Sequence, residues 1–394
     1  MHRLLKVLVI LTALYVTAGC TTTSPPVQPE QAPPPGVTLP LPASAPAVTA
    51  PAPVPVPEPG VTLLPGAQPH IALLLPLNDP GLGQAAKVVQ QGFSAGASQQ
   101  PDGLPIRVYA CADEPKEVAA LYQQALENGA RAVVGPLTPA GVAALAAQPS
   151  IPVPTLVLNR LDTQAPANLY SFGLMLENEA RQAARVASLA DLHTAIIVST
   201  GNPLSSRLVD AFQVEWKKLG GNVAANIVFT GDTSVFANLP ITPGNMVFIA
   251  ANADTARKFR PFLDPMLPVY ATSQIFKGNT HTLINYDLRD VVFFDMPWLL
   301  QQDRPVVKRY PRLAPGQSMD MERLYALGID SYRLINVLMN NQEQGDMNLD
   351  GVTGIITLGS NHVFEREAVE AEFVDGQGIS MEAAEAQQKS KAGH

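Results

Sequence analysis

Five polar residues stand where short apolar runs of this sequence end, and they are its best candidates for binding chemistry: Asn78, Thr138, Asn159, Asn202 and Asp295. Ligands of open α/β sheets bind beyond the carboxyl ends of the strands, where such residues would lie. Thr138 precedes an expected helix, whose free backbone N–H groups could hold a carboxylate. Asp295 could pair with an ammonium group, so the set would suit an amino-acid-like ligand.

Each candidate also has a structural interpretation, and the sequence leaves both open. Thr138 is a favourable helix N-cap, and asparagine is common in the turns that follow strands. Asp295 lies in the stretch VVFFDMPWLL, where it could accept backbone N–H groups at a corner before Pro297. In the same stretch, Trp298 is interpreted as core packing, with a partner-binding anchor as the alternative. Further polar residues occupy the expected strand ends: Asp79, Arg160, Asn252, Thr272 and Ser273.

The sequence lacks the common motifs of catalysis, cofactor binding and metal binding. Its 6 histidines include no pair spaced as two ligands on one helix, and no cysteine stands near one of them. A nucleophile elbow, a Walker loop and a complete dinucleotide-binding fingerprint are also absent. We therefore expect no catalytic residue, no metal and no cofactor, and we favour recognition over catalysis.

The first residues have the layout of a secretory signal. A short basic start precedes a largely apolar run at 7–16, which is too short to span a membrane. The stretch TAGC at 17–20 resembles the lipobox of bacterial lipoproteins, in which Cys20 would receive lipid and become the mature N-terminus. A plain secreted protein with an incidental cysteine is the alternative. Thr21, in place of an aspartate, resembles the pattern of sorting to the outer membrane. We therefore expect a signal peptide at 1–19 and a lipid anchor facing the periplasm.

A proline-rich segment follows the expected lipidation site. Fifteen of the 37 prolines lie between residues 24 and 66, where only Glu30 and Glu58 are charged. Such a composition cannot bury enough apolar surface to fold, and it is typical of an extended tether. We therefore interpret residues 20–67 as a lipidated cysteine followed by a disordered spacer that holds a globular body away from a membrane.

The composition also restricts the partners and the redox chemistry of the body. The formal net charge is −8 and no basic cluster occurs, so nucleic acid is a poor partner. With Cys20 lipidated, Cys111 is the only remaining cysteine, and no disulfide within the mature chain is possible. Cys111 lies in an apolar run and is interpreted as a buried small hydrophobic residue.

Short apolar runs alternate with helical patterns along the body, which is long enough for two domains. A first series of expected strands is followed by a second: 70–77, 106–112, 132–137 and 154–159, then 169–174, 194–200, 222–229, 245–251, 268–272 and 291–295. This alternation predicts parallel strands covered by helices on both faces. We therefore expect an α/β fold of two doubly wound lobes with a cleft between them.

The lobe boundaries follow from the rhythm of these series. The first lobe is predicted at 68–168, joined by about 300–340, and the second at 169–299, joined by about 341–378. Residues 353–376 are expected to form a closing hairpin around positions 360 and 361. A polar tail is expected at 379–394.

Several stretches in a fixed order resemble one known family: HIALLLPLNDPGLGQAAKVVQQGF, ARAVVGPLTPAGVAAL, PTLVLNR, PVYATSQIF, VVFFDMPWLL, MERLYALGIDSYRLI and GVTGIITLGSNHVFEREAVEAEF. They resemble the C-terminal domain of the penicillin-binding-protein activator lipoproteins, the LpoA/LppC family, over most of 68–376. The longer members carry a helical-repeat domain before this one, and here the proline-rich segment takes its place.

The resemblance implies a type I periplasmic-binding-protein-like fold. It also implies an outer-membrane-anchored, non-enzymatic protein that binds and stimulates a class A penicillin-binding protein in peptidoglycan synthesis. The alternative is a periplasmic solute receptor that binds an amino-acid-like or wall-peptide ligand between its lobes. Contacts made through the missing helical-repeat domain would not be available to this chain.

Overall fold

The computed structural model describes residues 63–280, 282–340 and 347–392. The chain forms two units, Met1–Val56 and Pro57–His394, and all described residues belong to the second. The expected signal peptide, Cys20 and nearly all of the predicted tether therefore lie outside the described residues. Within the described ranges, no helix is both long enough and apolar enough to cross a membrane.

An eight-stranded sheet forms the centre of the first lobe, in the order β11-β12-β13-β5-β4-β3-β1-β2. Its strands are β1 (His70–Leu75), β2 (Ile106–Ala110), β3 (Ala130–Val134), β4 (Thr155–Val157), β5 (Leu169–Phe172), β11 (Asn348–Asp350), β12 (Ile355–Leu358) and β13 (Val363–Glu367). All pairs are parallel except β11–β12 and β12–β13. Every residue of β1 is buried, as expected for a parallel strand that is covered on both faces.

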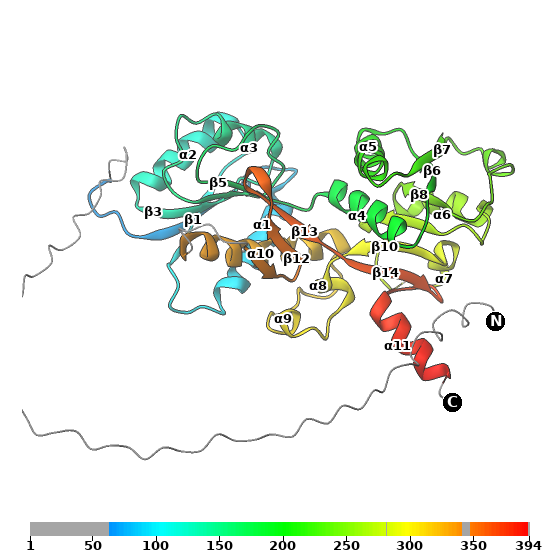
Figure 1. Ribbon diagram of the computed structural model, residues 1–394. Helices are drawn as coiled ribbons and strands as arrows, with labels where there is room; N and C mark the ends of the chain where they lie inside the picture. Colours follow the sequence, from blue (N-terminus) through cyan, green and yellow to red (C-terminus); the bar gives the residue numbers. More distant parts are fainter. Residues whose placement is uncertain (1–62, 281, 341–346, 393–394) are drawn as a thin grey trace, which may run out of the picture. The chain divides into compact units, whose positions relative to one another are not determined.

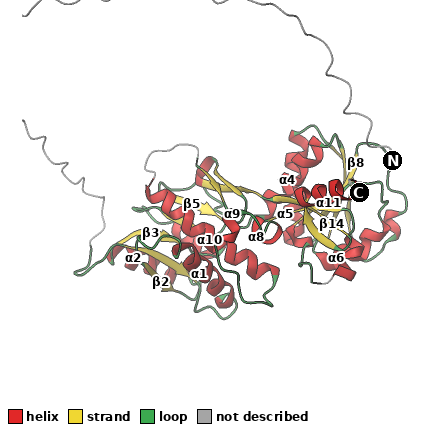
Figure 2. Ribbon diagram, turned by 90° about the horizontal axis from the view of Figure 1, so that it is seen from below, coloured by secondary structure: helices red, strands yellow, loops and turns green. Residues whose placement is uncertain are grey.

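Helices cover this sheet: α1 (Gly83–Ala97), α2 (Pro115–Glu127), α3 (Pro139–Ala146) and α10 (Met319–Asn340). Although α10 is distant in sequence, it packs along α1 and lies beside it in both views (Figures 1 and 2). Glycines permit this close packing, because a Cβ atom on Gly92 would lie 1.9 Å from the carbonyl oxygen of Tyr325. Likewise, a Cβ atom on Gly328 would lie 2.2 Å from the carbonyl oxygen of Val89.

The second lobe is built on a seven-stranded sheet, in the order β15-β14-β10-β9-β8-β6-β7. Its strands are β6 (Thr194–Ser199), β7 (Asn222–Val228), β8 (Asn245–Ala250), β9 (Val269–Thr272), β10 (Val291–Asp295), β14 (Val369–Val374) and β15 (Gln377–Ser380). This lobe contains the helices α4 (Leu176–Leu189), α5 (Pro203–Lys218) and α6 (Ala253–Phe259). Stacked rings on α5 and β8 fill part of its core, with Phe212 4.2 Å from Phe248 between ring centroids.

The chain passes between the lobes at three places, and these differ from the predicted boundaries. β5 pairs with β4 and β13 in the first lobe, although the second lobe was predicted to begin at residue 169. The segment from Val363 to Val374 divides at Ala368, with β13 in the first sheet and β14 in the second. Local apolar patterns mark a strand but carry no information about its distant partner. The prediction that 341–378 joins the second lobe was therefore wrong for β11, β12 and β13, and only the part from β14 onward belongs there.

The last part of the chain contains the expected hairpin and, in place of the expected polar tail, a strand and a helix. The expected hairpin is present, because β12 and β13 pair antiparallel around Asn361, whose backbone is left-handed at φ 60°. The predicted polar tail, by contrast, begins in β15 and continues as α11 (Met381–Ala392). This helix packs against β14 and β15, and residues 379–392 therefore belong to the second lobe.

The stretch VVFFDMPWLL forms β10 and the short helix α8 (Pro297–Leu300), which leads the chain back to the first lobe. Trp298 is fully buried, its indole N–H donates to Glu322 Oε2 at 2.7 Å, and its backbone N–H donates to Val352 O. The guanidinium carbon of Arg312 lies 4.0 Å from the centroid of the indole ring. Trp298 thus packs in the core at the corner, in agreement with the interpretation favoured from the sequence.

Candidate functional site

Thr138 caps α3 with its side chain. Its hydroxyl oxygen accepts the backbone N–H of Gly141 at 3.2 Å, and the hydroxyl group donates to Asp113. The side chain is buried, and its hydroxyl group acts both as a donor and as an acceptor within the first lobe. This geometry agrees with the N-cap interpretation.

Asn159 and Asn78 also contact the backbone of the first lobe. The amide of Asn159 donates to Leu137 O at 2.8 Å, and its Oδ1 accepts the backbone N–H of Arg160. The amide of Asn78 donates to Ala110 O at 3.3 Å. These contacts secure the turns that follow the strands.

In the second lobe, Asn202 and Asn252 cap helices. Asn202 Oδ1 accepts the backbone N–H of Ser205 at the start of α5, at 2.8 Å. Asn252 Oδ1 accepts the backbone N–H of Thr255 at the start of α6, at 3.0 Å. Asparagine satisfies a free N–H group of the first helical turn in both cases.

Asp295 is fully buried and forms an ion pair with Arg323 on α10. Arg323 Nη2 lies 2.6 Å from Asp295 Oδ2, and Oδ1 accepts the backbone N–H of Met296 at 2.9 Å. Arg323 Nη2 also donates to the carbonyls of Ser273 and Phe276. Burial alone would lower the pKa of Arg323, but the charge and hydrogen bond of Asp295 raise it above its usual value. The ion pair gives Asp295 a structural role, which was the alternative to ligand capture.

A second buried ion pair joins Glu179 on α4 to Arg366 on β13. Glu179 Oε2 also accepts the backbone N–H of Ser273 at 2.8 Å, and Arg366 Nη1 donates to Thr353 O at 3.3 Å. Burial raises the pKa of Glu179 above its usual value, while the charge of Arg366 acts in the opposite direction. Sequence reasoning missed both residues, because nothing in the local pattern relates positions so far apart.

A pocket of about 310 Å³ is lined by residues of both lobes. Of the five candidates predicted from the sequence, Asn159 is among its lining residues, together with the neighbouring Arg160. Glu177 on α4 accepts from Arg207 Nε at 2.8 Å and lies 3.6 Å from Arg160 Nη1. Burial would raise the pKa of Glu177, but the hydrogen bond and charge of Arg207, with the charge of Arg160, hold it below its usual value. The structure thus brings Asn159 to this pocket, whereas Asn78, Thr138, Asn202 and Asp295 do not line it.

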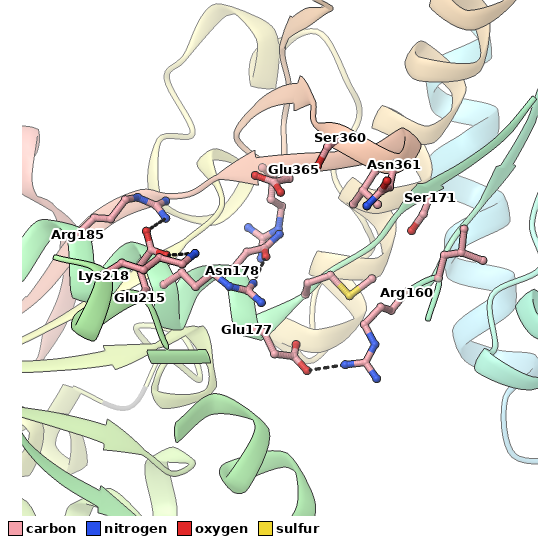
Figure 3. Close-up of a pocket in the computed structure, with 15 residues that line it drawn as sticks. Arg160, Ser171, Glu177, Asn178, Arg185, Glu215, Lys218, Ser360, Asn361 and Glu365 are labelled. Carbon is pink, nitrogen blue, oxygen red and sulfur yellow. Dashed lines mark hydrogen bonds and ion pairs between the residues drawn. The ribbon is translucent and has the colours of Figure 1, made fainter. Parts of the chain in front are cut away.

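A larger pocket of about 500 Å³ lies between α4, α5 and the β12–β13 hairpin (Figure 3). The residues that line it come from both lobes: Arg160, Leu161, Ser171, Met175, Glu177, Asn178, Arg181, Arg185, Glu215, Lys218, Ser360, Asn361, Val363, Glu365 and Arg366. Its wall is rich in charged and amide side chains, which suits the recognition of a polar ligand.

The family model described as "LppC putative lipoprotein" matches residues 61–240 and 242–376. The chain belongs to the LppC family. It is 27% identical over 322 residues to the penicillin-binding protein activator LpoA of Haemophilus influenzae, covering 78% of this chain and 54% of the relative. It is 28% identical to the LpoA of Pasteurella multocida, covering 79% of this chain and 55% of the relative. The LppC-family chain thus spans about half the length of these curated relatives.

Solved structures of other proteins have a fold similar to that of the LppC-family chain. The C-domain of Haemophilus influenzae LpoA, described as "a regulator of PBP1A", matches with a TM-score of 0.70 and 25% identity, covering 79% of this chain and 99% of that domain. A "putative branched-chain amino acid ABC transporter" from Chromobacterium violaceum matches with a TM-score of 0.68 and 34% identity. The match covers 77% of this chain and 100% of the Chromobacterium violaceum chain. A leucine-binding protein of Thermotoga maritima, at a TM-score of 0.51 and 18% identity, shows the fold alone.

These matches confirm the predicted family and the type I periplasmic-binding-protein-like fold of two α/β lobes. They also confirm that the similarity is to the C-terminal domain of the longer activators. The curated relatives are named as activators, which is a regulatory role.

The cysteine and histidine side chains of the LppC-family chain have structural roles where they are described. Among the described residues, no group of three or more His, Cys, Asp or Glu side chains is placed to hold a metal ion. Cys111 is fully buried, and burial raises the pKa of its thiol, as expected for an inert core residue. The buried His70 is hydrogen-bonded to Tyr109 at 3.0 Å and stacks on its ring, which is a packing role.

Proposed function

We propose that this LppC-family chain is an outer-membrane-anchored lipoprotein that binds a class A penicillin-binding protein and stimulates its peptidoglycan synthesis. The observation that carries the proposal is the match to 99% of the isolated C-domain of LpoA, which is described as a regulator of PBP1A. The chain catalyses no reaction in this proposal, and its contribution is recognition. The matched domain in the longer relatives works alongside further sequence, so the partner and the activity are proposed for this chain.

The proposed absence of catalysis is supported by how the polar residues at the strand ends are used. Thr138, Asn202 and Asn252 cap helices, and Asp295 is held by Arg323. An enzyme would need reactive groups exposed at this edge, where these side chains instead stabilise the lobes.

The proposed site of lipid attachment is Cys20. The proline-rich residues after it would form the spacer as far as about residue 63, because the backbone N–H of Leu64 already donates to Glu127 O in the first lobe at 2.9 Å. The proposal rests on the lipobox-like stretch at 17–20 and on membership in a lipoprotein family. The partner would then be reached from the periplasmic face of the outer membrane.

The test is a binding and activity assay with purified proteins. The full chain is immobilised and challenged with each class A synthase of the organism, and glycan polymerisation and peptide crosslinking are then measured with and without the chain. We expect one synthase to bind and to gain rate. Absence of binding and of any rate change for every class A synthase would reject the proposal.

A second candidate function is a solute receptor, favoured by the 34% identity to the Chromobacterium violaceum protein over the whole of that chain. In this role, Asn159 and Arg160 in the smaller pocket would contact an amino-acid-like ligand. Thermal-shift screening against amino acids separates the two functions. A stabilising amino acid whose effect is lost in Asn159→Ala, in a chain that activates no synthase, would favour the receptor.

A further inference from the structure

Three segments carry the chain between the lobes, and side chains tie these segments together. The first crossing leads from β5 into α4, the second from β10 into α8, and the third from β13 into β14 (Figure 1). In two-lobed proteins that close around a ligand, a few residues in such segments act as hinges and absorb the change in backbone dihedral angles. Contacts between the crossings therefore determine how freely the lobes can rotate.

The first and third crossings are joined through α4. Glu179, in the first turn of α4, forms its buried ion pair with Arg366, which lies just before Ala368. Gln182, also buried on α4, donates from Nε2 to Ala368 O at 2.8 Å and accepts the backbone N–H of Ala368 at 3.0 Å. One amide side chain thus holds both polar groups of the Ala368 backbone, at the point where the chain divides between the two sheets. A hinge rotation at Ala368 would break these hydrogen bonds.

The second crossing is held by a residue of the opposite lobe. Arg323 lies on α10, which packs along α1 in the first lobe. Its guanidinium group pairs with Asp295 at the end of β10 and donates to the carbonyls of Ser273 and Phe276 at 3.1 and 3.0 Å. These three acceptors belong to the second lobe. One cation of the first lobe is therefore inserted among oxygen atoms of the second.

Ser273 connects the two groups of contacts. Its backbone N–H donates to Glu179 Oε2 at 2.8 Å, and its carbonyl accepts from Arg323. The cluster contains two carboxylates and two guanidinium groups, and each of these four side chains is at most 10% exposed. Separating buried charges that water does not reach leaves them uncompensated, which strongly disfavours the separated state. The cluster therefore opposes any rotation that moves one lobe away from the other.

The charged residues of the 310 Å³ pocket are also paired with one another. Arg160 lies 2.6 Å from Asp162 and 3.6 Å from Glu177, which accepts from Arg207. The contact between Arg160 and Glu177 joins the lobes, because the first residue follows β4 and the second lies on α4. Arg160 is half exposed, so this contact contributes little by itself. The buried cluster at the crossings is the main restraint.

We propose that the hinge of this chain is fixed, so that the two lobes keep one relative orientation in solution. They do not open and close as the lobes of ligand-closing receptors do. The contacts of Glu179 and Arg323 across the crossings provide the restraint. A surface formed by both lobes is then ordered before a partner arrives, and binding does not have to supply the free energy of arranging it. This property belongs to the chain alone and goes beyond the proposed function.

The test is a distance measurement by pulsed electron paramagnetic resonance between spin labels on the two lobes of the purified full chain. The labels are attached at Gln124→Cys on α2 and Asp210→Cys on α5, which are exposed positions outside the cluster. Cys20→Ser and Cys111→Ala remove the two native thiols. A second pair, Asp210→Cys and Lys258→Cys, lies within the second lobe and gives the peak width of labels on a rigid body. We expect one interlobe peak that is as narrow as this reference.

Arg323→Met tests the origin of the restraint, because it removes the ion pair and both carbonyl contacts at the second crossing. Its interlobe peak should broaden or gain a second component, while the peak of the second-lobe pair stays unchanged. Arg333→Met is the matched control: it makes the same substitution on the same helix, but Arg333 pairs with Asp330 within α10. If Arg323→Met fails to fold by circular dichroism, the double variant Glu179→Leu with Arg366→Met replaces it with the same expectation. Replacing both partners leaves no buried charge unpaired.

Three results would overturn the proposal. The first is an interlobe peak in the parent that is broader than the within-lobe reference or divided in two. The second is an unchanged interlobe peak in the folded variant that lacks the contacts, and the third is equal broadening in Arg333→Met. Neither a synthase nor a ligand is present, so the outcome is independent of the proposed function.

Discussion

The carboxylate of Glu179 is paired with the guanidinium group of Arg366, which lies 187 residues further along the chain. The first residue belongs to α4 of the second lobe, and the second belongs to β13 of the first. Both side chains are almost completely buried, at 2% and 3% exposure. The contact, with the similar pair of Asp295 and Arg323, therefore joins the two lobes through charges that have left water.

Removing one partner of the Glu179–Arg366 pair should strongly destabilise the protein. Arg366→Met leaves the Glu179 carboxylate buried without its cation, and we expect the free energy of unfolding to fall by about 3–5 kcal/mol. Urea denaturation followed by circular dichroism measures this change. Arg185→Met is the matched control: its contact with Glu215 is partly exposed, and its loss should cost no more than about 1 kcal/mol. Equal losses in the two variants would contradict the assignment.

Glu370 on β14 should make stability depend on pH. Burial, and then the charge of Glu372, raises the pKa of Glu370 in the folded state. The folded state therefore holds this proton more tightly than the unfolded state does, so the contribution to stability is largest below the ordinary pKa and declines as pH rises through the raised pKa. Glu370→Gln removes this decline. The variant should be more stable, relative to the parent, at about pH 7 than at about pH 4, as measured by urea denaturation.

The uncharged substitution Gln377→Asn on the neighbouring β15 provides the control for this pH experiment. Its stability relative to the parent should be the same at both pH values, because no titrating group is changed. A Glu370→Gln variant whose relative stability is larger at the lower pH would contradict the sign of the pKa shift.

Gly92→Ala should separate α1 from α10. The new Cβ atom would lie 1.9 Å from the carbonyl oxygen of Tyr325, so the helices must move apart. Overpacking of this kind costs about 1–3 kcal/mol or more. Gly81→Ala is the matched control: its Cβ atom would meet only Asp79 Oδ1 at 3.4 Å, an ordinary contact, and the change should be within about 0.5 kcal/mol. Thermal unfolding of both variants measures the difference, and equal melting temperatures would exclude a tight helix contact.

Cys20→Ser should abolish lipidation if the TAGC stretch is a lipobox. The parent, expressed with radiolabelled palmitate, should carry the label and sediment with outer membranes, because several acyl chains form a lasting anchor. The variant should be unlabelled and absent from the membrane fraction. Cys111→Ser tests the other cysteine, and it should leave labelling unchanged. A labelled Cys20→Ser protein would refute this attachment site.

Much of the secondary structure could be predicted from sequence because its signals are local. The six buried residues of β1 form one uninterrupted apolar run, and such a run predicts a strand that is covered on both faces. The β12–β13 hairpin was predicted in the same way, from two runs separated by turn residues near Asn361. The family was also predicted correctly, from short motifs kept in a fixed order.

The candidate site was less accessible to the same reasoning. The sequence placed Asn159 at a strand end, and the structure brings it to a pocket lined by both lobes. Thr138 and Asn202 satisfy the first turns of helices. A cap and a ligand-binding residue have the same sequence signature, since both are polar residues between a strand and a helix.

The sequence by itself determined the alternation of strands and helices, the α/β class and the order of the elements, because these depend on neighbours within a few turns. Only the tertiary structure decided that β5 belongs to the first sheet, that Ala368 divides one extended segment between two sheets, and that Glu179 meets Arg366. Each of these depends on pairing between residues far apart in the chain. Such pairing is set by the competition among all strands and side chains for the same partners, which no local pattern records.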